Sequence, residues 1–208
     1  NTNGGPILAT SHESLYSTQF VDQSDRPLIC MDTTYSAIMI AWPLYIEKGR
    51  WLVTETINIL YISLSGNTKY FISRLTTYFE KERHVRVSSI NVKEHPEFTT
   101  LDQPFVTFLP AFLKGGNGVN DGYTEILTTI LGDYLAYEGN YQHCYGIIGS
   151  GNRNFNKQFA LTAKQYAKRF DFPYITDFEL RGTAHDIPRI ADAILTYRNQ
   201  FCFQTTKE

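Results

Sequence analysis

The chain has 208 residues, of which 42% are hydrophobic and 19% are charged, so it has enough apolar side chains to form the core of one domain of ordinary size. Its 14 tyrosines and 14 phenylalanines exclude an intrinsically disordered chain. Nineteen basic and 21 acidic side chains give a formal net charge of -2, which argues against nucleic-acid binding and against attraction to anionic membranes.

Cysteine usage and hydropathy indicate the cellular compartment. Cys30, Cys144 and Cys202 form no CxxC pair and are odd in number, as is typical of unpaired thiols in a reducing compartment. The longest weakly charged apolar stretch, residues 35–46, is shorter than the roughly 18 to 20 residues that a membrane-spanning helix needs. It also lacks the basic segment and cleavage site of a signal peptide. We therefore expect a cytoplasmic protein without a membrane-spanning helix.

The first quarter of the chain differs in character from the rest. Residues 1–53 show no sustained period of two or 3.6 residues, and we interpret them as an N-terminal extension of uncertain structure. Met31 is a natural internal start, so upstream sequence of no biological relevance is an alternative interpretation of residues 1–30. A single domain over residues 54–208 is expected to follow.

From Thr56 onward, short β-rich runs alternate with segments of helical periodicity. Strands are predicted over residues 57–63, 85–90, 105–109, 145–149 and 174–180. Helices are predicted around residues 71–79, 126–135, 159–170 and 186–201, the last with Thr183 and Asp186 at capping-box spacing. This alternation predicts an α/β domain with a doubly wound, five-stranded parallel sheet in the flavodoxin-like order 2-1-3-4-5. Ligands of such a sheet bind at the carboxyl ends of its strands.

One connection departs from the alternation. The stretch between Ile90 and Phe105 has no convincing helical pattern, so a shortened helix or an extended connection is expected there.

The first predicted strand runs into Ser63-Leu64-Ser65-Gly66-Asn67-Thr68 and then into a helix. Three hydroxyl groups, with a glycine that lets N–H groups turn inward, suit a phosphate monoester at a helix N-terminus. The segment has neither the lysine of the GxxxxGK[ST] loop nor a GxGxxG pattern, which excludes the common nucleoside-triphosphate and dinucleotide loops. An ordinary turn capped by Asn67 or Thr68 is the alternative.

Two further polar segments follow the third and fourth strands. Residues 115–122 contain four glycines, which allow close approach to a flat ligand; a flexible surface loop is the alternative. Residues 149–155 read Gly-Ser-Gly-Asn-Arg-Asn-Phe, where backbone groups could hold a ring. Because the carboxyl ends of parallel strands share one edge, we expect these two segments and residues 63–68 to converge.

Other candidate sites are disfavoured by spacing. The five histidines form no HxH or HxxxH pair, so no metal site is predicted. Ser65 has no GxSxG context, which argues against a hydrolase nucleophile. The basic side chains between Lys157 and Arg169 indicate a solvated helix face, or alternatively a surface for an acidic partner.

Four segments together resemble the NrdI family, flavodoxin-like activators of class Ib ribonucleotide reductase. The most specific are residues 149–155 and Phe-Glu-Leu-Arg-Gly-Thr at residues 178–183; residues 63–68 and 110–112 support them. The resemblance covers about residues 56–200 and none of residues 1–53.

The resemblance implies a bound FMN, whose phosphate would be held by Ser63, Ser65, Gly66, Asn67 and Thr68. The flavin ring would lie between two groups of residues: Pro110, Ala111, Phe112, Lys114, Gly115 and Gly116, and Gly151, Asn152, Asn154 and Phe155.

The chemistry that the resemblance implies is borne by the flavin and not by catalytic side chains. The reduced flavin would react with O2 and supply a superoxide-type oxidant to the reductase β subunit, for assembly of its dimanganese-tyrosyl radical cofactor. An electron donor protein or reductase would be a second partner, and the protein would be an accessory activator more than a metabolite-converting enzyme. Alternatives are a flavodoxin-type single-electron carrier, an interaction protein that has lost flavin, and an NAD(P)H-dependent flavin reductase.

The chain departs from the family pattern after Phe112, where Leu113 and Lys114 precede the glycines. We hypothesise that Lys114 stabilises an anionic reduced flavin by Coulomb attraction if it lies near the ring. A lysine that points to water is the alternative.

Overall fold

The computed structural model describes residues 46–47, 50–51, 56–115 and 122–205. Within the predicted extension, the described residues form two short antiparallel strands, β1 (Ile46–Glu47) and β2 (Arg50–Trp51). The rest of that extension lies outside the described residues, and its boundary near residue 53 stays a prediction.

A five-stranded parallel sheet forms the centre of the domain. Its strands are β3 (Thr56–Tyr61), β4 (Arg86–Asn91), β5 (Phe105–Pro110), β6 (Cys144–Gly151) and β7 (Tyr174–Glu179). They lie in the order β4-β3-β5-β6-β7, and every neighbouring pair is parallel. Numbered along the chain, this is the predicted order 2-1-3-4-5. The prediction of a flavodoxin-like doubly wound sheet is therefore confirmed.

The burial of each strand follows its place in the sheet. All six residues of the central strand β5 (Phe-Val-Thr-Phe-Leu-Pro) are buried, as expected for a strand that is covered on both faces. The edge strand β4 (Arg-Val-Ser-Ser-Ile-Asn) is instead largely exposed.

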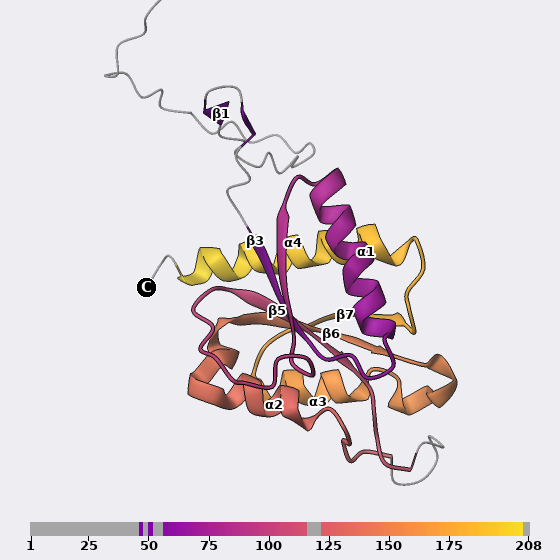
Figure 1. The fold of residues 1–208 in the computed structure, drawn as a ribbon. Coiled ribbons are helices and arrows are strands. Elements are labelled where there is room, and N and C mark those ends of the chain that lie inside the picture. Colours follow the sequence, from indigo (N-terminus) through magenta and orange to yellow (C-terminus); the bar gives the residue numbers. More distant parts are fainter. Residues whose placement is uncertain (1–45, 48–49, 52–55, 116–121, 206–208) are drawn as a thin grey trace, which may run out of the picture. The chain divides into compact units, whose positions relative to one another are not determined.

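Helices cover both faces of the sheet. Helices α1 (Asn67–Glu82) and α4 (Asp186–Thr205) lie on one face, and α2 (Thr129–Ala136) and α3 (Leu161–Phe170) on the other (Figure 1). Short 3₁₀ helices η1 (Tyr137–His143) and η2 (Arg153–Gln158) flank β6. None of the helices in the described part of the chain is both long enough and apolar enough to cross a membrane.

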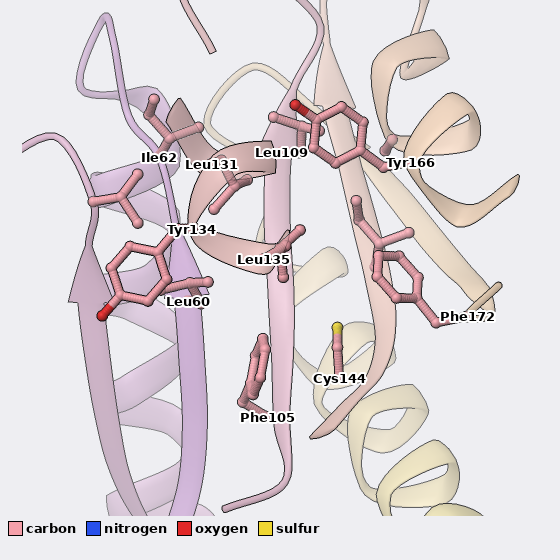
Figure 2. Packing of buried hydrophobic residues seen from close by; sticks show 13 residues of the cluster. Leu60, Ile62, Phe105, Leu109, Leu131, Tyr134, Leu135, Cys144, Tyr166 and Phe172 are labelled. Carbon is pink, nitrogen blue, oxygen red and sulfur yellow. The ribbon is translucent and has the colours of Figure 1, made fainter. Parts of the chain in front are cut away.

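Each face has its own apolar core. On the α2 and α3 face, Leu60 and Leu109 from the sheet pack with Leu131, Leu135 and Tyr166 from the helices (Figure 2). On the opposite face, aromatic rings dominate: the rings of Phe71 and Phe178 stack with centroids 3.9 Å apart, and Phe108 packs beside both.

The connection between β4 and β5 contains no helix, so of the two expected alternatives, a shortened helix and an extended connection, the structure has the second. The backbone of this segment is held by hydrogen bonds to the side chain of Asn140, which is buried. The Asn140 side chain accepts a hydrogen bond from the Leu101 N–H (2.7 Å) and donates to the Thr99 carbonyl (3.0 Å). Two backbone polar groups of the segment are thereby paired although it lacks regular structure.

The predicted start of α2 is wrong. The apolar spacing predicted helix from Ile126, whereas the helix begins at Thr129. The Ile126 N–H donates instead to the Phe112 carbonyl (2.9 Å), and Leu127 has φ +63°, outside the helical region. Both side chains are exposed. Pairing with the segment after β5 thus overrides the local periodicity.

The capping box at the start of α4 is confirmed. The Thr183 N–H donates to Asp186 Oδ2 (2.8 Å), and the Asp186 N–H donates to Thr183 Oγ1 (3.3 Å). Partial burial alone would raise the pKa of Asp186, but hydrogen bonds from Arg189 and Thr183 lower it to about 2. This cap fixes the loop that leaves β7, which contributes to the site described next.

Candidate functional site

A cavity of about 320 Å³ lies at the carboxyl edge of the sheet. The segments that follow β3, β5, β6 and β7 form its walls. Its lining residues are Leu64, Ser65, Asn67, Thr68, Pro110, Ala111, Phe112, Leu113, Ser150, Gly151, Asn152, Phe155, Gln158 and Leu180. Residues far apart in the sequence are thus brought together at the edge where the sheet order places ligands.

The structure places many of the expected site residues in the cavity wall. Nine line it: Ser65, Asn67, Thr68, Pro110, Ala111, Phe112, Gly151, Asn152 and Phe155. Five are described but lie outside the lining: Ser63, Gly66, Lys114, Gly115 and Asn154. Gly116 lies outside the described residues.

Five lining residues were not expected from the sequence: Leu64, Leu113, Ser150, Gln158 and Leu180. Leu64 and Ser150 lie inside segments that the sequence had singled out for their hydroxyl, glycine and asparagine residues, and Leu113 was named only as a departure from the family pattern. Leu180 lies in the Phe-Glu-Leu-Arg-Gly-Thr segment, which served only for the family resemblance. Gln158 has no local signal, because its place in the wall depends on how the chain turns after residue 155.

The 63–68 segment leaves the start of α1 open toward the cavity. Gly66 is the N-cap residue with φ +83°, a conformation that glycine adopts at little cost, and it provides no side-chain cap. Asn67 and Thr68 belong to the first helical turn, so the alternative prediction, an ordinary turn capped by one of these two residues, is wrong. Ser63 Oγ accepts from the Lys69 N–H (3.1 Å). No described group accepts from the N–H groups of Asn67 and Thr68.

The loop after β7 is hydrogen-bonded to the 63–68 segment. Arg181 Nε donates to Asn67 Oδ1 (3.0 Å), and the guanidinium lies 5.5 Å from the centre of the Tyr70 ring. Arg74 donates in turn to the carbonyls of Gly182 (3.1 Å) and Thr183 (3.2 Å). The start of α1 and the start of α4 are therefore held against each other.

Between β5 and α2, residues 113–114 pair through backbone hydrogen bonds with residues 124–125. The Lys114 N–H donates to the Thr124 carbonyl (2.8 Å), and Leu113 and Glu125 form an antiparallel bridge. This pairing turns Leu113 into the cavity wall, while Lys114 is exposed. We call residues 122–126 the return limb.

Side chains from η2 and α3 anchor the return limb. Gln158 Nε2 donates to the Gly122 carbonyl (2.9 Å), and Gln165 Nε2 donates to the Tyr123 carbonyl (3.0 Å). The Tyr166 hydroxyl donates to the Glu125 carboxylate (2.8 Å to Oε2). Burial, together with the Glu125 carboxylate, raises the pKa of the Tyr166 phenol well above its ordinary value. Tyr166 therefore stays a protonated donor at neutral pH.

The 149–155 segment is also fixed by hydrogen bonds. The Ser150 carbonyl accepts from the Ala111 N–H (2.8 Å), and the Gly151 carbonyl accepts from the Leu180 N–H (2.9 Å). Asn152 Oδ1 caps η2 by accepting from the Asn154 N–H (2.9 Å). Phe155 remains 44% exposed although it lines the cavity, so its ring belongs both to the site and to the outer surface.

None of the described residues that line the cavity carries a charge. The wall is largely apolar, with hydroxyl and amide groups from Ser65, Asn67 and Thr68 gathered at the start of α1. Such a cavity suits a flat apolar ring joined to an anionic group, because the ring meets the apolar wall and the anion meets the helix N-terminus. In the described part of the chain, no cluster of histidine, cysteine, aspartate or glutamate could bind a metal ion.

Comparisons with known proteins agree with the flavodoxin-like fold. Residues 59–192, more than half of the chain, match the family model described as "NrdI Flavodoxin like". An NrdI-like protein of Streptococcus pyogenes serotype M18 is 53% identical over 140 residues, which cover 67% of this chain and 92% of that protein. Protein NrdI of Bartonella henselae is 32% identical over 129 residues, which cover 62% of this chain and 86% of its own.

Among solved structures, the domain is similar to a short-chain flavodoxin associated with a non-canonical PDU bacterial microcompartment. The TM-score is 0.50 at 14% sequence identity, over 71% of this chain and 99% of the flavodoxin. At this identity the likeness shows a shared fold.

Two glycines of β6 provide a test of the site's construction. A Cβ on Gly149 would lie 2.6 Å from the Ala160 Cβ, whereas a Cβ on Gly151 would meet its nearest atoms at 3.5 Å. We expect Gly149→Ala to lower the free energy of unfolding by about 1–3 kcal/mol through overpacking. Gly151→Ala is expected to change it by less than about 0.5 kcal/mol, although the new methyl group lies in the cavity wall. Urea denaturation of both variants measures the difference, and equal losses would contradict this description.

Proposed function

The chain belongs to the NrdI family of flavodoxin-like proteins, and from this we propose that it binds FMN in the cavity and activates a ribonucleotide reductase. The observation that carries the proposal is a largely apolar cavity, without charge among its described lining residues, that adjoins the open N-terminus of α1. A flavin mononucleotide has the matching chemistry, with a flat ring system at one end and a phosphate at the other.

The phosphate would be held at the start of α1. The N–H groups of Asn67 and Thr68 have no described acceptor, and the Ser65 and Thr68 side chains face the same cavity. The helix dipole adds partial positive charge at this end. Since no lysine or arginine lines the cavity in the described residues, neutral donors would bind the phosphate.

The ring would lie among the remaining lining residues. Phe112 and Leu113 provide one wall, Gly151 and Asn152 provide backbone groups and an amide, and Leu64 and Leu180 contribute apolar surface. These residues would exclude water from the ring and orient it by hydrogen bonds to its edge. When bound, FMN would supply the electron transfer and the reduction of O2, for which the lining side chains have no suitable groups.

We propose further that the partner is the β subunit of a class Ib reductase. In this account an electron donor protein supplies electrons, and O2 is reduced at the cavity to a superoxide-type oxidant. The oxidant then serves assembly of the dimanganese-tyrosyl radical cofactor in the partner. Phe155, which lines the cavity and is 44% exposed, would contact that partner; Leu180, also a lining residue, is 45% exposed and would lie beside the same contact.

Phosphate binding at the N-terminus of α1 can be tested by removing one hydroxyl group, that of Thr68. Thr68 is 2% exposed and lines the cavity from the first turn of α1. We expect Thr68→Val to weaken FMN binding about tenfold, as for the loss of one hydrogen bond to a charged group. Binding of riboflavin, which lacks the phosphate, should change less than about twofold.

Thr77→Val is the matched control, since the Thr77 hydroxyl bonds to the Ser73 carbonyl (3.0 Å) on the same helix, away from the cavity. Fluorescence titration with each flavin gives the dissociation constants. Equal weakening for FMN and riboflavin, or no weakening of FMN, would contradict the proposed phosphate position.

Activation is tested by mixing the reduced FMN-loaded protein, a manganese(II)-loaded class Ib β subunit and O2. We expect the tyrosyl radical to form, as measured by electron paramagnetic resonance, and to require the flavoprotein. Phe155→Ala should weaken capture of the β subunit at least about fivefold through loss of an aromatic contact.

Tyr137→Ala is the control for that variant, because Tyr137 is similarly exposed (39%) but does not line the cavity. No radical above the level without flavoprotein would contradict the activator function and favour a single-electron carrier. Undiminished capture by Phe155→Ala would contradict the docking face.

A further inference from the structure

Gln158, a residue of the cavity wall, is hydrogen-bonded to the return limb. Its side chain is only 6% exposed, lines the cavity and donates from Nε2 to the Gly122 carbonyl (2.9 Å). Gln158 ends η2, which directly follows the 149–155 segment, whereas Gly122 begins the return limb. The hydrogen bond therefore connects the segment after β6 with the segment after β5.

The fit between these residues leaves no room for a side chain on Gly122. A Cβ built there would lie 1.3 Å from Gln158 Nε2. Gly122 is itself buried, so its carbonyl depends on Gln158 for a hydrogen-bond partner. The glycine thus allows the close approach, and the amide satisfies the carbonyl that the approach buries.

The backbone around Gln158 follows a strained path. Asn156 has φ +44° and ψ -108°, and Ala160 has φ +54°, both unfavourable for residues other than glycine. Along this path Asn156 and Lys157 are exposed, while Gln158 is turned inward. The chain accepts this strain at the position where the side chain reaches the return limb.

We propose that Gln158 is a positioning residue, which holds the return limb, and with it the paired lining residue Leu113, against the 149–155 segment and thereby sets the affinity and midpoint potentials of the flavin bound in the cavity. The inference rests on the proposed function, because it concerns the same cavity. Gln158 would affect the ring end of the flavin, because the phosphate would lie at the N-terminus of α1.

Gln165 provides a matched control. Its Nε2 donates to the Tyr123 carbonyl (3.0 Å), the next residue of the return limb, but Gln165 does not line the cavity. Methionine has nearly the length of glutamine and has no N–H donor. Gln158→Met and Gln165→Met therefore each remove one hydrogen bond from neighbouring carbonyls of the return limb; the first is buried and comes from a cavity-lining side chain, and the second is exposed.

The experiment measures dissociation constants for FMN and riboflavin, and midpoint potentials of the bound flavin, for wild type and both variants. Gln158→Met should weaken binding of both flavins about tenfold, equivalent to about 1.4 kcal/mol, because the ring end is common to them. It should also shift the midpoint potential, by about 30 mV for a two-electron couple if the affinities of the oxidised and reduced flavin change tenfold relative to each other. Gln165→Met should match wild type in both measurements.

Wild-type affinities and potentials in Gln158→Met, or equal effects of both variants, would overturn the inference. If Gln158→Met does not fold, Gln158→Glu repeats the test with a side chain of the same length, which cannot donate when ionised. Wild-type values for that variant would overturn the inference equally. A wild-type chain that binds no flavin would instead overturn the proposed function.

Discussion

The candidate site depends on one constraint: five parallel strands bring their carboxyl ends to a single edge of the sheet. Residues 64–68, 110–113, 150–158 and 180 are distant in sequence, yet each group follows a strand that ends there. Apolar packing on both faces fixes the strand positions, as Figure 2 shows for the α2 and α3 face, and hydrogen bonds between the loops fix the positions of the residues that follow the strands. The position of Phe155, an exposed residue of the cavity lining, therefore depends on the packing of the sheet.

The absence of charge in the described cavity lining gives the site its chemical character. An anion held only by N–H groups, hydroxyls and a helix dipole is bound by directed hydrogen bonds, so geometry matters more than ionic strength. The apolar wall also makes negative charge on a bound ring costly, which is a means of tuning its potential. Lys114 is exposed and lies outside that wall, and its proposed Coulomb role stays a prediction.

The sequence predicted features that local chemistry determines. Strand order followed from alternating β-rich and helical runs, and nine of the expected residues lie in the cavity wall because glycine, hydroxyl and asparagine side chains mark strand ends. Features set by tertiary contact could not be predicted. Ile126 pairs with Phe112 instead of entering α2, Ser63 bonds to the Lys69 N–H, and Gln158 faces inward because of the strained path at Asn156. No local pattern encodes these arrangements.

The most direct test of the central claim is titration of the purified chain with FMN, followed by visible absorption. We expect saturable binding at one site, with bands near roughly 375 and 450 nm that bleach on anaerobic reduction with dithionite and return in air. That result would establish that the chain binds one redox-active flavin. A chain that stays colourless and shows no saturable binding would contradict the account, and the cavity would then be only a feature of the inherited fold.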